Sequence, residues 1–182
     1  MKNYLTKFCL LTFGAILIGF TATAQSGNDG KVFEGIDNPE SYSTLDLLHM
    51  DRQVSTFSDL VALANLEVSL TLADSPHTLF VPTNEAFADM TIEEFAELTD
   101  PKNRTKLINF VKRHYMPKKV MKRDFKDADI MDTEGEEEIR VSTTGNTVSI
   151  GGAQIVEPDI KTSDGVIQIM DNVLQPTGDI MN

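Results

Sequence analysis

The sequence predicts one α+β domain in which helices come first along the chain and a β-sheet follows. Up to about residue 114, helix-capping patterns recur and apolar residues keep helical spacing. After Lys119 the apolar residues alternate with polar ones, as in strands that bury one face. Because the 182 residues contain no internal repeat, a single domain is expected.

Helix starts in the first half are marked by residues whose side chains cap backbone amides. Four segments carry this signal: residues 43–46, 56–59, 91–94 and 100–101. The helix from residue 91 is expected to pack Ile92, Phe95 and Ala96 inward. The next one is expected to place four residues on one face: Leu107, Phe110, Val111 and His114.

Strand signals come from short β-favouring runs and from turns. Residues 78–81 form such a run, which Pro82 ends and after which Thr83 caps a further helix. A hairpin is expected around Gly145-Asn146, followed by a strand at residues 154–156. Residues 166–170 are apolar except for Gln168, and a run with so many apolar residues is typical of a central strand.

The first 24 residues have the features of an export signal. Lys2 and Lys7 precede an apolar run at residues 8–20, and Ala22-Thr23-Ala24 is a small-residue cleavage pattern. That run is too short to span a hydrocarbon core about 30 Å thick. We therefore expect a signal peptide at residues 1–24, a flexible mature N-terminus at 25–40, the domain at 41–176 and a tail at 177–182. The protein is expected to be secreted or periplasmic after cleavage near Ala24, with no membrane span left.

Charge and cysteine content exclude several classes of protein. The net charge is −12, and removal of Lys2 and Lys7 with the signal makes it −14. This acidic balance argues against a nucleic-acid partner. Cys9 lies inside the signal, so the exported chain has no thiol and depends on its core for stability.

No catalytic or metal-binding set is visible in the sequence. There is no cysteine nucleophile after residue 24 and no Gly-x-Ser-x-Gly elbow, and His49, His77 and His114 are far apart. We predict a non-enzymatic protein without a cofactor or metal. An acidic run could suggest calcium, but Met131 and Asp132 occupy the fifth and sixth loop positions counted from Asp127, so a solvated acidic loop is the preferred interpretation. The run comprises Asp124, Asp127, Asp129, Asp132, Glu134, Glu136, Glu137 and Glu138.

Ten of the 14 basic residues that follow the signal lie between Lys102 and Lys126. This segment either neutralises the acidic run and a helix C-terminus, which is the interpretation we prefer, or presents an anion-binding face. His114 lies within it. A core histidine that bonds a backbone carbonyl is favoured over a surface contact or pH sensor, because His114 continues the apolar helix face.

Three segments together resemble the fasciclin domain family. Residues 78–87 match its first signature, residues 164–176 are similar to its closing signature, and His114-Tyr115-Met116-Pro117 lies where the family has a Tyr-His pair, an apolar pair and Pro. The signature residues are Thr78, Phe80, Pro82, Thr83, Asn84, Phe87, Gly165, Val166, Ile167 and Asp171. The resemblance implies a fasciclin-like fold, with the helices packed on a β-sandwich or wedge and the two signatures on neighbouring central strands. Arg113 departs from the pattern, because the family has Tyr there.

The resemblance also implies adhesion as the function. We expect an exported binding module that contacts a protein or an anionic polysaccharide at the cell surface. Its expected contact residues are Arg113, His114, Tyr115, Pro117, Lys118 and Lys119. One alternative is a carrier of an apolar, carotenoid- or lipid-like molecule, suggested by Phe87, Met90, Met116 and Met121, and an enzyme of unknown type is the third hypothesis.

Overall fold

The computed structural model describes residues 30–68, 76–135 and 137–177. Among these residues the helices precede most of the strands, as predicted, and no helix is long and apolar enough to cross a membrane. The helices are α1 (Thr44–Met50), α2 (Ser55–Ala64), α4 (Ile92–Thr99) and α5 (Arg104–Arg113). The strands are β1 (His77–Pro82), β2 (Tyr115–Met116), β3 (Ile130–Met131), β4 (Ile139–Thr144), β5 (Thr147–Ile150), β6 (Ala153–Lys161) and β7 (Gly165–Met170).

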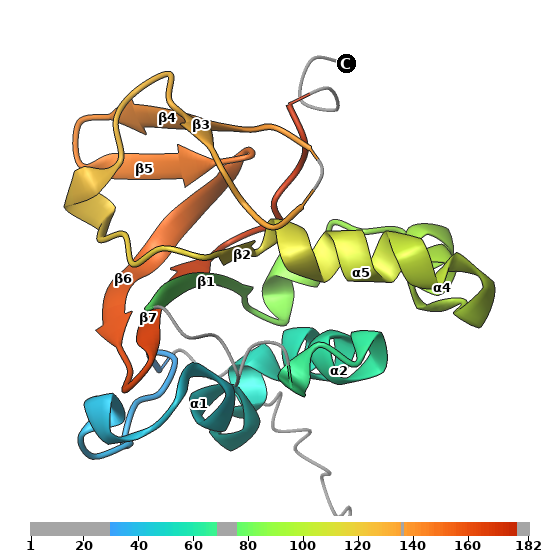
Figure 1. The fold of residues 1–182 in the computed structure, drawn as a ribbon, viewed down its shortest axis with the longest axis horizontal. Coiled ribbons are helices and arrows are strands. Elements are labelled where there is room, and N and C mark those ends of the chain that lie inside the picture. The colour runs from blue at the N-terminus through green and yellow to red at the C-terminus, as the bar shows by residue number, and fades with distance from the viewer. Residues whose placement is uncertain (1–29, 69–75, 136, 178–182) are drawn as a thin grey trace, which may run out of the picture.

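The strands form one seven-stranded sheet in the order β2-β1-β7-β6-β5-β4-β3. β1 and β7 pair in parallel, from His77 opposite Gly165 to Pro82 opposite Met170, and the other pairs are antiparallel. The two signatures therefore lie side by side at the centre, which confirms what the resemblance implied. β6 has two register irregularities, and the sheet curls so that β3, β4 and β5 stand away from β1 (Figure 1).

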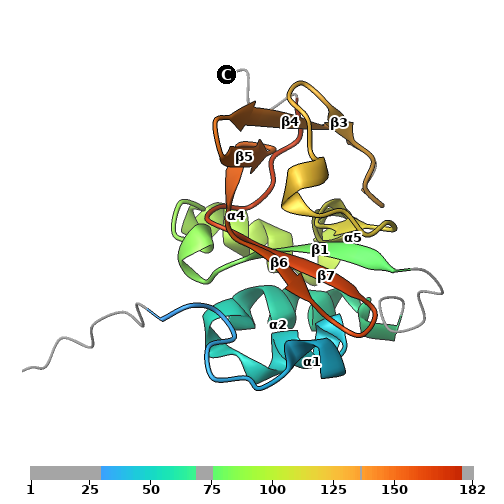
Figure 2. The same ribbon diagram turned by 90° about the vertical axis from the view of Figure 1, so that its left-hand side faces the viewer.

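The central pair, β1 and β7, has a hydrophobic core on each face. Leu79 and Val81 of β1, with Ile167 and Ile169 of β7, face the helices. Phe80 and Met170, which alternate with them, face the curled part of the sheet. Figure 2 shows this pair between α1 and α2 on one side and β4 and β5 on the other. Every residue of β1 and β7 is buried, which explains why both strands are mainly apolar, although Thr78 and Gln168 are polar.

Capping explains where most of the helices begin. Ser43 and Thr91 form the predicted capping boxes of α1 and α4, and Asp100 caps a short 3₁₀ turn that leads into α5. α2 begins one residue before the predicted start and has no local side-chain cap. The Asn84 side chain caps it from a distance, accepting from the Thr56 amide at 2.9 Å and donating to the Arg52 carbonyl at 2.7 Å. This signature residue thus joins the end of β1 to the start of α2.

Three local expectations are corrected by the structure. Ile92 is 83% exposed and Ala96 is exposed, because α4 turns Phe95 and Leu98 toward α5 instead. The segment after Thr83 is a single 3₁₀ turn rather than a helix, with Thr83 Oγ1 accepting from the Ala86 amide.

The third correction concerns the predicted N-terminal segment, residues 25–40. Within it, Val32 and Phe33 are buried in the helical core. Their amides donate to Glu157 and Asp51 at 2.9 and 2.5 Å, so the folded domain begins before residue 41. The expected signal peptide at residues 1–24 lies outside the described residues, and so does the tail except for Thr177, which bonds the Glu138 carbonyl.

Candidate functional site

The candidate contact residues lie where α5 ends and β2 begins. His114 ends the helix with φ −88° and ψ 2°, and the chain then extends into Tyr115 and Met116, which pair with Leu79 and Thr78 of β1. The His114 carbonyl accepts from the Phe80 amide at 2.9 Å. The histidine is therefore fixed against the first signature by its backbone before its side chain is considered.

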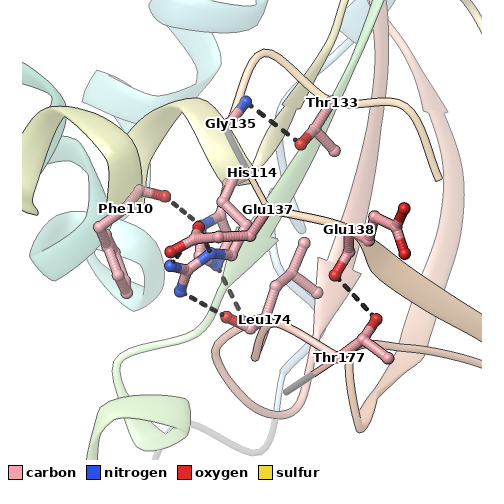
Figure 3. Close-up of polar contacts among 9 residues, drawn as sticks. Phe110, His114, Thr133, Gly135, Glu137, Glu138, Leu174 and Thr177 are labelled. Atoms are coloured by element: carbon pink, nitrogen blue, oxygen red, sulfur yellow. Dashed lines mark hydrogen bonds and ion pairs between the residues drawn. The ribbon is translucent and has the colours of Figure 1, made fainter. Parts of the chain in front are cut away.

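The His114 imidazole is completely buried and has a hydrogen bond at each nitrogen. Nδ1 lies 2.8 Å from the Phe110 carbonyl, one helical turn earlier, and Nε2 accepts from the Leu174 amide at 3.2 Å (Figure 3). Because Nδ1 must donate and Nε2 must accept, the ring is neutral with its proton on Nδ1. It packs against Phe57 and Phe110, with ring centroids 5.2 and 4.7 Å away.

The Arg113 side chain also binds the backbone of Leu174. Its Nη1 donates to the Leu174 carbonyl at 3.2 Å, while Nη2 and Nε donate to Glu137 Oε2 at 2.7 and 3.1 Å. The Arg113 side chain is only 12% exposed. Both backbone polar groups of Leu174 are thus satisfied by consecutive side chains, an arrangement we call the Leu174 lock (Arg113, His114 and Leu174). The lock attaches the closing signature to α5, and its use of Glu137 shows that the acidic run is not only a solvated loop.

The expectation that His114 and Tyr115 contact a partner is corrected by their burial. His114 has no exposed surface, and Tyr115 is 9% exposed, with its ring 5.2 Å from that of His77. Burial, followed by the charges of Glu134 and Asp164, raises the pKa of the Tyr115 phenol. The interpretation that the helical spacing favours, a core histidine that bonds a backbone carbonyl, agrees with this geometry.

Pro117, Lys118 and Lys119, in contrast, are exposed. They begin a segment that we call the basic loop, residues 117–126, which carries five cations. These cations are Lys118, Lys119, Lys122, Arg123 and Lys126. Among the described residues, neither Lys118 nor Lys119 takes part in an ion pair.

The basic loop is anchored to the central strands through its backbone. Thr78 Oγ1 donates to the Lys118 carbonyl at 2.7 Å and accepts from the Val120 amide at 2.8 Å. Gln168 Nε2 donates to the Val120 carbonyl at 3.1 Å, and the Lys122 amide donates to Asp159 Oδ1 at 2.7 Å. Thr78 therefore has a definite role as a signature residue: it fixes a loop in which four of the five cations are exposed and Lys122 is half-buried.

The cations on α5 are differently placed from those of the basic loop. Lys106 pairs with Glu97, and Arg104 Nη2 donates to the Ala64 carbonyl at 3.2 Å. Arg113 belongs to the Leu174 lock. The basic segment at residues 102–126 thus divides into a helical part that includes internal contacts and a loop part that faces outward.

The remaining signature residues stabilise strand ends. Asp171 Oδ1 accepts from the Gln154 amide at 2.7 Å, which holds the end of β7 against β6. A side chain on Gly165 would collide with the His77 carbonyl oxygen, so only glycine allows β1 and β7 to approach here. Phe87 fills the helical core, with its ring centroid 6.3 Å from those of Phe95 and Phe110.

The apolar residues that suggested a carrier are not gathered around one cavity. Met90 lines a hollow of about 580 Å³ between α4, α5 and the Gly151-Gly152 turn. Met116 lines a different hollow of about 450 Å³ beside β3. Both hollows also contain charged side chains, so neither is lined by apolar residues alone.

His77 is a second buried histidine, at the start of β1. Its Nε2 lies 3.1 Å from Thr44 Oγ1, and burial lowers the pKa of His77. Within the described ranges no three His, Cys, Asp or Glu side chains are placed to hold a metal ion.

The domain thus has a central pair of parallel strands with a hydrophobic core on each face. A buried histidine, His114, attaches the segment after β7 to the end of α5. The chain belongs to the fasciclin domain family, whose model matches residues 52–176. The match includes both signatures, the Leu174 lock and the basic loop.

Individual relatives agree with this membership. Periostin of Homo sapiens is 32% identical over 157 residues, which is 84% of this chain but only 18% of periostin. Protein sll1483 of Synechocystis sp. is 32% identical over 124 residues, 66% of this chain and 68% of that protein. A more distant relative, 26% identical over 157 residues, is named heme ligase in Plasmodium falciparum.

The solved structure of a FAS1 domain pair from the insect cell adhesion molecule fasciclin I shares the fold. Its TM-score is 0.56 at 19% identity, and the match covers 77% of this chain and 53% of that one. The predicted α+β, fasciclin-like fold is confirmed.

Because His114 is buried in its neutral form, we expect the free energy of unfolding to decrease as pH falls. Burial is the main cause that lowers the pKa of His114 from 6.5 to about 3, and the Arg113 charge acts in the same direction. In the unfolded state His114 binds a proton below pH 6.5, whereas in the folded state it binds one only below about pH 3. The contribution of neutral His114 to the free energy of unfolding is therefore fully present above pH 6.5 and is lost between pH 6.5 and about 3. Between pH 7.5 and 5.5 we expect a loss of about 1.4 kcal/mol from His114, with His77 adding in the same direction.

Urea unfolding followed by circular dichroism at the two pH values measures this loss. The window lies above the ordinary pKa of carboxyl groups, so protonation of acids contributes little there. Equal free energies of unfolding at pH 7.5 and 5.5 would contradict a neutral, buried His114.

Proposed function

We propose that this protein is an exported adhesion module that attaches to an anionic partner through the basic loop. The observation that carries the proposal is the separation of two groups of residues. Arg113 and His114 are engaged in the fold, whereas Lys118 and Lys119 stand exposed on a backbone anchored at Thr78 and Gln168. A preordered loop loses little conformational freedom on binding, which favours its use as a contact surface.

Electrostatics supports an anionic partner. In a chain of net charge −12, five cations within ten residues create a local field of the opposite sign. Such a field steers acidic partners toward the loop and repels cationic ones. Adhesion as the proposed role follows from membership of the family and from its relative fasciclin I, which is an insect cell adhesion molecule.

Export follows from the signal pattern at residues 1–24. Mass spectrometry of the protein from its native host should find a chain that begins at Gln25, outside the cytoplasm. A chain that retains Met1 to Ala24 inside the cell would contradict the proposal.

Removing two loop cations should weaken attachment. For Lys118→Gln/Lys119→Gln we expect about tenfold weaker binding to cell-envelope fractions at low salt, since each exposed charge contributes roughly 0.5–1 kcal/mol. Sedimentation of labelled protein with the fractions, at low and high salt, measures the change.

The matched control is Lys102→Gln/Lys112→Gln, which removes the same charge from α5 and from the 3₁₀ turn that precedes it. We expect it to weaken binding less than twofold. Equal losses for the two double variants would show that net charge matters and that the loop does not. Binding that is insensitive to salt would also contradict the proposal.

A further inference from the structure

One end of the basic loop forms a wall of a groove of about 450 Å³. The opposite walls are the β4–β5 turn at Gly145-Asn146 and the irregular part of β6 at Pro158-Asp159. In Figure 1 the short helical turn at Lys122–Asp124 lies beside that end of the β4–β5 hairpin. Segments distant in sequence thus meet at one concave place, whose volume is within the range of about 300–1,000 Å³ typical of small-molecule sites.

The cations of this groove are available to a ligand, whereas one oxygen of each nearby aspartate is held by N–H donors of the fold. Asp159 Oδ1 accepts from the Lys122 amide and from Gln168 Nε2, at 2.7 and 2.9 Å. Asp127 Oδ1, close by, accepts from the Thr143 amide at 2.9 Å.

The Lys122 ammonium has no ion-pair partner in the part of the chain that the structure describes. Arg123 has one contact, at 3.7 Å, to its neighbour Asp124, and both side chains are mostly exposed. An exposed pair of this kind contributes little and is readily exchanged for a ligand anion.

Neutral polar groups and an aromatic ring complete the lining. The Asn146 amide and the Thr143 hydroxyl can donate and accept, and neither side chain forms a hydrogen bond within the described segments. Phe125 is half-buried, with its ring centroid 6.1 Å from Phe80, so packing fixes the ring while part of it faces the groove.

We propose that this groove binds an acidic sugar unit of an anionic polysaccharide. Lys122 and Arg123 bind the carboxylate of the sugar unit. Asn146 and Thr143 form hydrogen bonds with its hydroxyl groups, and Phe125 packs against the C–H face of its ring. The sugar unit carries a carboxylate, hydroxyl groups and a C–H face on one rigid ring, which matches the three kinds of group that line the groove. An acidic peptide can bond the amide and the hydroxyl through its main chain, but it has no such ring to pack against Phe125. The inference rests on the proposed function, because it names the chemistry of the partner that the basic loop attracts.

The test uses the full mature domain and a fluorescent oligogalacturonate, a polymer of uronic acid. The deciding variant is Asn146→Ala, which removes hydrogen bonds from the groove without changing charge. Fluorescence anisotropy should show about fivefold weaker binding of oligogalacturonate, the effect of one hydrogen bond, and unchanged binding of polyglutamate. Thermal unfolding confirms that the variant folds, since Asn146 is exposed in a turn.

Lys122→Gln/Arg123→Gln separates the possible outcomes. The inference holds if this variant weakens binding of oligogalacturonate more than binding of polyglutamate, and if neutral maltooligosaccharides do not compete. It is overturned if Asn146→Ala has no effect and the double variant weakens both polyanions equally, because the loop then recognises charge alone. In that case the proposed function survives, whereas failure of every polyanion to bind would remove both.

Discussion

Replacing His114 with alanine should cost about 3–5 kcal/mol of folding free energy, the largest loss that we expect from any truncation of the candidate contact residues. The change leaves a cavity between Phe57 and Phe110 and removes the acceptor of the Leu174 amide. Truncating a large buried side chain costs roughly 2–5 kcal/mol, and a buried amide without a partner adds about 1–3 kcal/mol before the surroundings relax. Urea unfolding followed by circular dichroism measures the difference.

His49→Ala is the matched control, since His49 is a histidine on the exposed surface of α1. We expect it to change stability by no more than about 0.5 kcal/mol. If His114→Ala were as stable as this control, yet lost attachment to envelope fractions, His114 would be a contact residue after all.

Gly165→Ala should destabilise the domain by about 3 kcal/mol or more. An alanine methyl group here would lie closer than 3.0 Å to the His77 carbonyl oxygen, a distance that real Cβ atoms essentially never show. The obstacle is backbone in the parallel β1–β7 pair, so no rotamer change can relieve it, and the two strands must separate. Soluble yield and the midpoint of thermal unfolding report the effect.

Gly152→Ala is the matched control for this substitution. Gly152 has φ +82°, but a Cβ there meets nothing within 4 Å. The control therefore carries only the backbone strain of a left-handed residue, about 1–2 kcal/mol. A Gly165→Ala protein as stable as Gly152→Ala would mean that the two signatures are not neighbours at this register.

Patterns that act within a few residues could be predicted from the sequence. Ser43, Thr91 and Asp100 cap the segments where they were expected to, because a cap depends on a side chain and an amide two or three residues away. The hairpin at Gly145-Asn146 is equally local. That β1 and β7 are neighbours, although they lie far apart along the chain, followed only from the resemblance, and their parallel direction was not predicted.

Burial that depends on distant segments was missed. Tyr115 belongs to a two-residue strand, too short for an alternating pattern to reveal it. Val32 and Phe33 lie in a polar segment without periodicity, yet Asp51 and Glu157 bind their amides. Ile92 fits a helical stripe, but α4 packs through Phe95 and Leu98, and spacing alone does not say which side meets a neighbour.

Only part of the expected contact site is exposed, because exposure there also depends on distant segments. The sequence places Arg113 to Lys119 in one continuous run, but α5 ends within it, so its first half faces Leu174 and its second half faces outward. A helical stripe through Phe110 had already favoured a buried His114. Nothing in the sequence could show that Asn146 and Thr143 meet Lys122, because that groove is formed by the curl of the sheet.

A nuclear magnetic resonance titration tests the central claim most directly. The amide signals of the mature domain are followed as oligogalacturonate is added at low salt. We predict that the largest shifts occur in residues 117–126 and 143–146, and that the amides of Arg113, His114 and Tyr115 stay within the noise. Shifts centred on those three residues, or on the hollow between α4 and α5, would contradict the account.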